Sequence, residues 1–432
     1  MRERLVLVAS ALAALAALVP AAGTTATTAP PASPGGIPRR VHLPEPWLPG
    51  TDATGPPGPV AVLQELAHVR ARWLSLEKGP ALLAVSADGD YAYLDLPHWQ
   101  PGSHATLSPD GRYVAWFELD EPGPGVPSRT LGLYDTSSGM VRHRRLPDGA
   151  ASGLLPDAML WGPGSSVLVV PSCVTRLPGN AGCESHPPTL VSVRDGRATD
   201  GRRLALTDGA TDGAPEGALD GAFVSGGDLG WGPDVLLLVT GPGHTLQPVD
   251  PATAGPGRHP LLLGDRPMSE PVLSPHGSMV AFLDPTSRPG RLWLATVPAR
   301  PAAGGAPPAR PVTSGWSVYA VVGWRDEGSV VVLGSRGRRV AVLAVDTRTG
   351  AVTPYLTLDR PLDHAPGVGD SPARDQLQLA RDLLTRPQPA GSRPAHRSDP
   401  RLVLADVVLA LGLLAALTRD VVRRRARRRT GA

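Results

Sequence analysis

The sequence is poor in several residue types, and each shortage excludes a class of protein. Its 432 residues include one lysine, Lys78, so arginine carries almost all of the positive charge. Two cysteines are too few for a disulfide scaffold, and aromatic residues make up only 4% of the chain. The nucleophile elbow, the P-loop, the dinucleotide glycine pattern, the HExxH motif and the EF-hand loop are all missing. The sequence therefore predicts no active site and no cofactor.

Glycine and proline are abundant, with 50 residues of each, about twice their usual combined share. Apolar residues still make up 41% of the chain and recur in short runs rich in Val and Leu, which indicates many short strands joined by tight turns. The formal net charge of +3 comes from the two ends, and the segment between them is slightly acidic. That segment has no general positive field, so we predict no nucleic-acid partner.

Residues 1–23 have the layout of a secretory signal peptide. Arg2 and Arg4 precede the apolar run Leu5–Val19, which is followed by a proline and three small residues. A charged segment, a short apolar segment and small residues, in this order, are typical of such a signal. The run is short for a membrane span. We expect cleavage near Gly23, with an uncleaved N-terminal anchor as the alternative.

The C-terminal end has the pattern of a membrane helix. Leu402–Leu417 is apolar apart from Asp406, and a cluster of arginines follows. The apolar side chains outweigh one carboxylate near a helix end, and clustered arginine favours the cytoplasmic side. We expect a transmembrane helix over residues 401–422 and a cytoplasmic tail over residues 423–432; a helix lying on the membrane surface is the alternative. The topology-determining residues are Arg423, Arg424, Arg425, Arg427, Arg428 and Arg429.

The two ends agree, because both place the segment between them outside the cytoplasm. We therefore expect a protein of the cell membrane whose main domain lies on the extracytoplasmic side. Residues 24–59 are rich in Thr, Pro and Gly and predict an extended linker that buries little surface. Residues 359–400 predict a short helix, over Asp375–Thr385, followed by a flexible stalk.

Between residues 60 and 358, short apolar runs alternate with turns that contain Gly, Pro or Asp. The runs are too short for helices and several are apolar throughout, so they predict an all-β fold whose strands are covered on both faces. The pattern also repeats. Ser108–Arg112 (SPDGR) precedes YVAWF and LGLYDTSSG, and Ser274–Ser278 (SPHGS) precedes MVAFL and RLWLATV. Trp324–Gly328 opens a third copy, and weaker copies begin at two other tryptophans.

The sequence SPDGRYVAWFE followed by LGLYDTSSG resembles the WD40-like repeat of TolB-type β-propellers. The resemblance covers residues 60–358 and implies a β-propeller of about six four-stranded blades, within a range of five to seven. It also implies a central channel with a binding surface at one or both ends. It implies no particular reaction, because this fold carries many functions.

Cys173 and Cys183 are the only cysteines, and they flank a short segment between two apolar runs, as at the mouth of a hairpin. In an exported protein two such cysteines usually form a disulfide, so we predict a bridge between them. The bridge would stabilise the protein by roughly 3 kcal/mol in the chain-entropy model. Zinc binding would need two further ligands, and only His186 is near in the sequence.

Other residues that could carry chemistry have a simpler interpretation. His98 and His104 are close in the sequence but lie in a turn-rich segment, where exposure is more common than metal binding. Asp88–Asp90 could hold a cation through its carboxylates, yet it also fits an ordinary turn. We predict no metal site. The tryptophans that recur at one position of the repeat are Trp161, Trp231 and Trp324. Their recurrence favours packing between blades over a sugar-binding platform.

These features together predict a non-enzymatic, membrane-tethered extracytoplasmic propeller that acts as a binding scaffold or sensor for a protein, a peptide or a cell-envelope ligand. The alternative is an exported propeller enzyme that acts on glycans as a hydrolase or lyase, because carboxylates from distant blades could converge on the channel. Charged side chains gathered at one channel mouth would favour the enzyme. A channel lined by small apolar residues would favour the binder.

Overall fold

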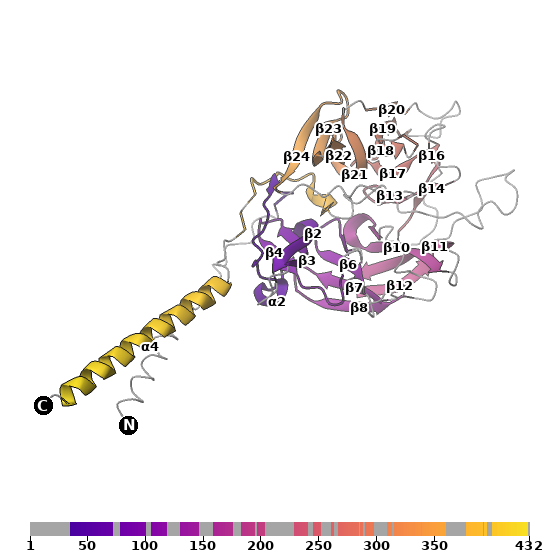
Figure 1. The fold of residues 1–432 in the computed structure, drawn as a ribbon. Coiled ribbons are helices and arrows are strands. Elements are labelled where there is room, and N and C mark those ends of the chain that lie inside the picture. The colour runs from indigo at the N-terminus through magenta and orange to yellow at the C-terminus, as the bar shows by residue number, and fades with distance from the viewer. Residues whose placement is uncertain are drawn as a thin grey trace. The chain divides into compact units, whose positions relative to one another are not determined.

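Short β-strands make up most of the structure, as the sequence predicts (Figure 1). The computed structural model describes residues 35–71, 78–100, 105–118, 130–146, 159–175, 183–194, 197–203, 229–240, 245–251, 261–262, 267–284, 286–287, 290–297, 309–312, 315–337, 339–359, 377–391, 393–394 and 400–430. The predicted signal peptide or anchor at residues 1–23 lies outside the described residues and stays a prediction.

In the described residues the strands form six antiparallel groups of four, called blades 1 to 6. Blade 1 contains β25 (Leu377–Leu379), β2 (Val60–Ala71), β3 (Lys78–Ser86) and β4 (Tyr91–Leu94). Blade 2 contains β5 (Ala105–Leu107), β6 (Tyr113–Phe117), β7 (Thr130–Asp135) and β8 (Val141–Arg145). Blade 3 contains β9 (Leu160–Trp161), β10 (Val167–Thr175), β11 (Cys183–Arg194) and β12 (Arg197–Arg203), with the 3-10 turn η1 (Pro163–Ser165).

Blade 4 contains β13 (Leu229–Trp231), β14 (Leu236–Thr240), β15 (Thr245–Val249) and β16 (Leu261–Leu262). Blade 5 contains β17 (Ser269–Leu273), β18 (Met279–Asp284), β19 (Arg291–Thr296) and β20 (Arg310–Pro311). Blades 4 and 5 form one continuous sheet, because β13 and β17 pair in parallel at Trp231 and Val272. Blade 6 contains β21 (Ser317–Asp326), β22 (Ser329–Arg336), β23 (Arg339–Asp346) and β24 (Val352–Leu358).

Buried apolar clusters connect each blade to the next. One cluster joins blades 6, 1 and 2, and four others join blades 2 and 3, 3 and 4, 4 and 5, and 5 and 6. Representative side chains with 0% exposure are Leu83, Leu131, Leu168, Leu236, Phe282 and Val331, one from each blade. Because blade 6 packs on blade 1 as well as on blade 5, the order of blades is closed. This is the arrangement of a β-propeller, which the sequence predicts.

The Ser-Pro-x-Gly motifs form the predicted turns between the first two strands of a blade. In blade 2 the Ser108 Oγ accepts a hydrogen bond from the Tyr113 N–H at 2.8 Å, and the Gly111 N–H donates to the Ser108 carbonyl at 2.9 Å. Gly111 has a φ of 77°, which suits glycine because it has no Cβ. The same bonds recur in blade 5 at Ser274, Gly277 and Met279.

The C-terminal part of the propeller differs from the sequence prediction. The helix expected over Asp375–Thr385 is wrong, because this segment contains β25 and the 3-10 turn η3 (Arg381–Leu383). β25 pairs antiparallel with β2, and Val62 lies opposite Leu379. Leu377 and Leu379 alternate with Gln378 and are 7% and 6% exposed, so their period of two belongs to a strand. A segment from the C-terminal end therefore supplies the innermost strand of blade 1.

The expectation of an extended linker over residues 24–59 is wrong for residues 35–59. They contain β1 (Arg40–Val41) and the helical turn α2 (Thr51–Thr54), and β1 pairs in parallel with β24 at the outer edge of blade 6. Ile37, Val41 and Leu48 are at most 5% exposed. This segment buries apolar side chains because the edge of blade 6 offers it a backbone partner.

Residues 377–391, here called the C-terminal strap, also bind this N-terminal segment. The Gly36 N–H donates to the Pro387 carbonyl at 3.2 Å, and the Arg39 N–H donates to the Pro389 carbonyl at 2.9 Å. The flexible stalk expected over Pro387–Pro400 is therefore wrong for residues 387–391. Residues from both ends of the propeller segment therefore help to close the ring of blades.

Beyond the strap, α4 (Pro400–Thr430) is one continuous helix (Figure 1). Among the described residues, no helix is both long enough and apolar enough to cross a membrane. The transmembrane helix expected over residues 401–422 is thus not found. The apolar run Leu402–Leu417 contains Asp406 and is shorter than the roughly 20 residues that a span requires.

Candidate functional site

A cavity of about 110 Å³ lies where the innermost strands of five blades meet. β25, β5, β9, β13 and β21 all contribute side chains to its wall. The lining residues are Ala105, Thr106, Leu107, Met159, Leu160, Trp161, Trp231, Ala320, Val321, Val322, Leu333, Val342, Leu377, Gln378, Leu379 and Arg381. Most of them are apolar. Among the described lining residues, Arg381 carries the only charge.

Gln378 uses its side-chain amide to complete the edge of blade 2. Its Oε1 accepts a hydrogen bond from the Leu107 N–H at 2.6 Å, and its Nε2 donates to the Ala105 carbonyl at 2.6 Å. The side chain thus pairs with β5 in the way that a neighbouring strand would. Gln378 joins blade 1 to blade 2 at the cavity wall, and these two bonds engage both ends of its amide.

Arg381 places a cation in this largely apolar cavity. Its guanidinium carbon lies 3.9 Å from the centroid of the Trp231 ring, within the range of a cation–π interaction. Its Nη2 donates to the Trp161 carbonyl. Since Arg381 follows β25 directly, docking of the C-terminal strap brings this charge to the innermost strands of blades 3 and 4.

All three recurring tryptophans pack between blades, and one of them also faces a charged side chain in the cavity. Trp161 Nε1 donates to the Thr106 carbonyl at 3.2 Å, and Trp324 Nε1 donates to the Val272 carbonyl at 3.0 Å. In both cases the acceptor lies on the innermost strand of the preceding blade, so the prediction of packing between blades is confirmed for these two. Trp231 also packs against apolar clusters that join neighbouring blades, and its ring in addition faces Arg381 in the cavity.

Side chains also join the turns of neighbouring blades. In blade 6, the Glu327 Oε1 accepts the His276 N–H of blade 5 at 2.6 Å, and its Oε2 accepts the Ser278 hydroxyl at 2.8 Å. The corresponding contact in blades 2 and 3 runs from the Asp110 N–H to Ser165 Oγ at 3.2 Å. Burial raises the pKa of Glu327, but these hydrogen bonds and the His276 ring outweigh it, so the pKa is lowered.

We expect Glu327→Gln to destabilise the protein at neutral pH and to have little effect in acid. A carboxyl whose pKa is lower in the folded protein stabilises it above the unfolded pKa of about 4.3, and that contribution is lost as pH falls through the folded pKa. The side chain is 31% exposed, so the loss at neutral pH should stay under about 1 kcal/mol. Urea unfolding at pH 7 and at about pH 3 measures it. A difference that grows in acid would contradict this assignment.

Of the histidines and aspartates considered from the sequence, those that the structure describes do not gather into a site. His98 has a φ of 54°, and His104 lies outside the described residues. Asp88–Asp90 forms the turn between β3 and β4, where the Asp90 N–H donates to Ser86 Oγ at 2.9 Å. In the described part of the chain, no group of three His, Cys, Asp or Glu residues could hold a metal ion.

The backbone of both cysteines lies on one hairpin of blade 3. Cys173 lies opposite Ser185, and Cys183 lies opposite Thr175, so the cysteines are diagonal neighbours on one face. Diagonal pairs are about 7–8 Å apart, whereas a disulfide joins Cα atoms about 4.4–6.8 Å apart. Their side chains lie outside the described residues, and the disulfide stays a prediction.

Alkylation under denaturing conditions tests the bridge. With the disulfide formed, the unreduced protein takes up no alkyl group, and the reduced protein takes up two. Alkylation of both cysteines in protein isolated from an oxidising compartment would contradict the bridge.

The sequence interpretation missed Gln378 and Arg381. The alternation Leu-Gln-Leu over residues 377–379 is the available signal for a strand, but the run is short, and Asp370-Ser371-Pro372 before it favours the start of a helix. Which blade it joins depends on a pairing with β2, more than 300 residues earlier in the chain. The six predicted topology arginines all lie on α4, away from this cavity's lining residues.

No family model and no curated protein matches the chain. Among solved structures, it is distantly similar to putative TolB from Agrobacterium tumefaciens, with 13% identity, a TM-score of 0.38, and 69% of this chain and 89% of that one covered. TolB from Acinetobacter baumannii gives 14% identity and a TM-score of 0.40, covering 70% and 68%. Prolyl oligopeptidase B from Galerina marginata gives 12% identity and a TM-score of 0.37, covering 66% and 41%. Similarities at this level carry no inference about function.

Proposed function

We propose that this chain is a non-enzymatic binding propeller that holds an apolar group of a protein, peptide or cell-envelope ligand in its central cavity. The main support for this proposal is the lining of the cavity. Its side chains are mostly apolar, and among the described lining residues only Arg381 is charged. Its volume of about 110 Å³ is well below the roughly 300–1,000 Å³ of pockets that enclose a whole small ligand. The cavity therefore suits one side chain or one chain end.

We further place the propeller on the extracytoplasmic side of the cell membrane. The support is the order of segments in the sequence, with a signal-like segment at residues 1–23 and a helix with an arginine-rich end at the other terminus. Attachment through α4 agrees with its large exposed apolar surface. The propeller is a scaffold or sensor there, and any inward signal passes to a partner protein.

One observation favours the alternative, an exported enzyme acting on glycans. Asp382 follows Arg381, and the loss of water around its carboxyl raises its pKa, while Arg381 lowers it and Asp110 raises it. Two carboxyls near one cation are a starting point for acid–base chemistry. However, the Asp110 carboxylate already accepts bonds from Ser108 Oγ at 2.7 Å and the Arg112 N–H at 3.0 Å. Asp382 is still an exposed residue by its accessible surface, so its carboxyl is only partly desolvated and water screens its interactions. The binder therefore remains our proposal.

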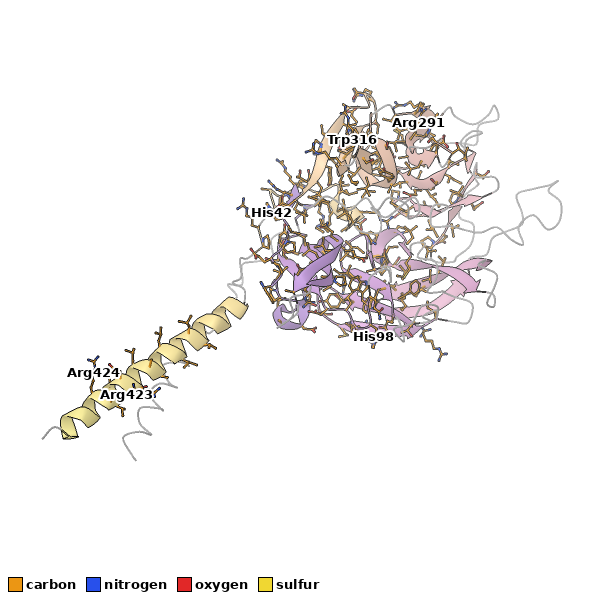
Figure 2. All side chains as sticks on the ribbon, viewed as in Figure 1. His42, His98, Arg291, Trp316, Arg423 and Arg424 are labelled. Atoms are coloured by element: carbon orange, nitrogen blue, oxygen red, sulfur yellow. The ribbon has the colours of Figure 1, made fainter. Side chains whose placement is uncertain are left out.

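Photocrosslinking in the native host tests the binder. A small diazirine-bearing aliphatic amino acid at Val322 lines the cavity without filling it, and the same amino acid at Arg291 is a surface control (Figure 2). We expect a discrete adduct from Val322 that is absent from Arg291 and disappears when Ala320→Phe fills the cavity. Equal adducts at both positions would contradict binding in the cavity.

The enzyme is tested separately with the purified chain and cell-wall glycan. Release of new reducing ends by the native protein, and its loss in Asp382→Asn, would establish the alternative and overturn the non-enzymatic proposal.

A further inference from the structure

α4 carries most of the exposed large apolar side chains in the described residues. Eight of them are between 44% and 64% exposed: Val408, Leu409, Leu411, Leu413, Leu414, Leu417, Val421 and Val422. Outside α4, only Leu43 and Met140 belong to the same group in the described part of the chain. A continuous exposed apolar surface of this kind marks a contact with a membrane or a partner.

The distribution of these side chains around α4 favours lipid over a protein partner. Successive residues of a helix are rotated by about 100°, so Val408, Leu409, Leu411 and Leu414 point in four different directions. A partner helix would cover one stripe and leave the other sides in water. A helix that lies in the headgroup region of a bilayer contacts lipid along a broader surface than one partner helix covers, and it does so without crossing the membrane.

The end of α4 adds a strong positive charge. The helix continues to Thr430, so the six arginines of residues 423–429 lie on about two helical turns. Arg423 and Arg424 are exposed and project from the helix (Figure 2). Arg424 forms an ion pair with Asp420 at 2.7 Å, with both side chains more than half exposed. Residues 419–432 contain seven arginines and one aspartate, so the end stays strongly cationic.

We propose that the arginine-bearing end of α4 binds the phosphate headgroups of anionic phospholipids, next to the apolar part of the same helix. Arginine recognises phosphate through paired N–H donors, and clusters of arginine beside a membrane segment are attracted to anionic lipid. This inference rests on the proposed membrane attachment and adds the class of lipid that α4 selects. Each arginine near an anionic surface should strengthen partitioning by about fivefold at low salt.

Vesicle flotation of the full-length chain tests the inference. The vesicles contain either phosphatidylcholine alone or phosphatidylcholine with about one-third phosphatidylglycerol. We expect binding to the anionic vesicles to be at least about tenfold stronger at low salt, and the preference to shrink as salt is added. A variant with all six arginines of residues 423–429 changed to glutamine should lose the preference and still float with both vesicles.

A second variant with the same change in net charge is the control. It carries glutamine at six exposed arginines of the propeller: Arg144, Arg145, Arg291, Arg336, Arg339 and Arg348. It should keep the preference for anionic vesicles. Equal binding of the native chain to both vesicles would overturn the lipid inference and leave membrane attachment intact. Absence of flotation with either vesicle would overturn both.

Discussion

A chain that ends at residue 376 will not fold, whereas a chain that ends at residue 399 will unfold at the same temperature as the full-length protein. The shorter chain lacks the C-terminal strap, whereas the longer one keeps it and lacks α4 and the two residues that follow. Circular dichroism and thermal unfolding of both truncations measure the difference.

The size of this effect follows from what the strap buries. Four of its leucines are 1% to 7% exposed: Leu377, Leu379, Leu383 and Leu384. Burial of each leucine side chain stabilises a protein by about 1.5–3 kcal/mol, and a domain has only about 5–15 kcal/mol in total. Removal of the strap also takes away Gln378, which leaves the Leu107 N–H and the Ala105 carbonyl without their hydrogen bonds to its side chain. The loss is comparable to the whole stability of the protein.

The chain that ends at residue 399 is the control, because it is shortened but can still close the ring of blades. It retains the strap and the bonds from Gly36 and Arg39. Cooperative unfolding of the 376-residue chain within a few degrees of the full-length protein would show that β25 is dispensable for the fold.

Trp116→Ala will destabilise the protein by about 3–5 kcal/mol, as expected for a large aromatic side chain removed from a core. Trp116 is 0% exposed and its Nε1 donates to the Pro97 carbonyl at 3.0 Å. The indole packs against Gly132 on the neighbouring strand, and an added Cβ at Gly132 would lie 2.3 Å from Trp116 Cε2. Urea unfolding measures the loss.

Gly132→Ala is the matched test of this contact. Alone, it forces the indole or the strand to move and should cost about 1–3 kcal/mol. In the Trp116→Ala background the clash is gone, so the same substitution should cost much less, and the two effects should not add. Additive effects would contradict the close contact between Gly132 and the indole.

The local features of the fold could be predicted from the sequence because local chemistry determines them. Ser108 and Gly111 form a turn through bonds within five residues of each other, and the apolar strand after them is buried on both faces. The same bonds in blade 5 identify the repeat. These contacts lie within one motif, so one sequence contains enough information to find them.

The closure of the ring could not be predicted in the same way. Leu377–Leu379 is three residues long, and its partner β2 lies at the opposite end of the propeller segment. Arg40–Val41 is two residues long, and the prolines and glycines that surround it predict a linker. Such short strands form only when a sheet edge is already present, and composition alone does not show where that edge is.

The cavity follows from closure, and for that reason it was missed as well. Arg381 reaches Trp231 and Trp161 only because β25 brings the strap to the centre of the propeller. Without this pairing, Arg381 is an ordinary arginine in a segment that the sequence predicts to be helical. The sequence contains one indication of contacts between blades, which is the repeated position of the tryptophans. It correctly predicts packing between blades for Trp161 and Trp324.

An engineered disulfide between β2 and β25 tests the closed ring most directly. Val62 and Leu379 lie opposite each other in the antiparallel pair, where Cα atoms are about 4.5–5.5 Å apart and within disulfide range. In a background with Cys173 and Cys183 changed to serine, Val62→Cys with Leu379→Cys should oxidise to a single bridge, identified by peptide mass spectrometry. The control pair, Val62→Cys with Leu292→Cys, lies in blades 1 and 5, which share no apolar cluster among the described residues, and should stay reduced. Bridging in neither pair, in a protein that remains folded, would contradict a ring closed by the C-terminal strap.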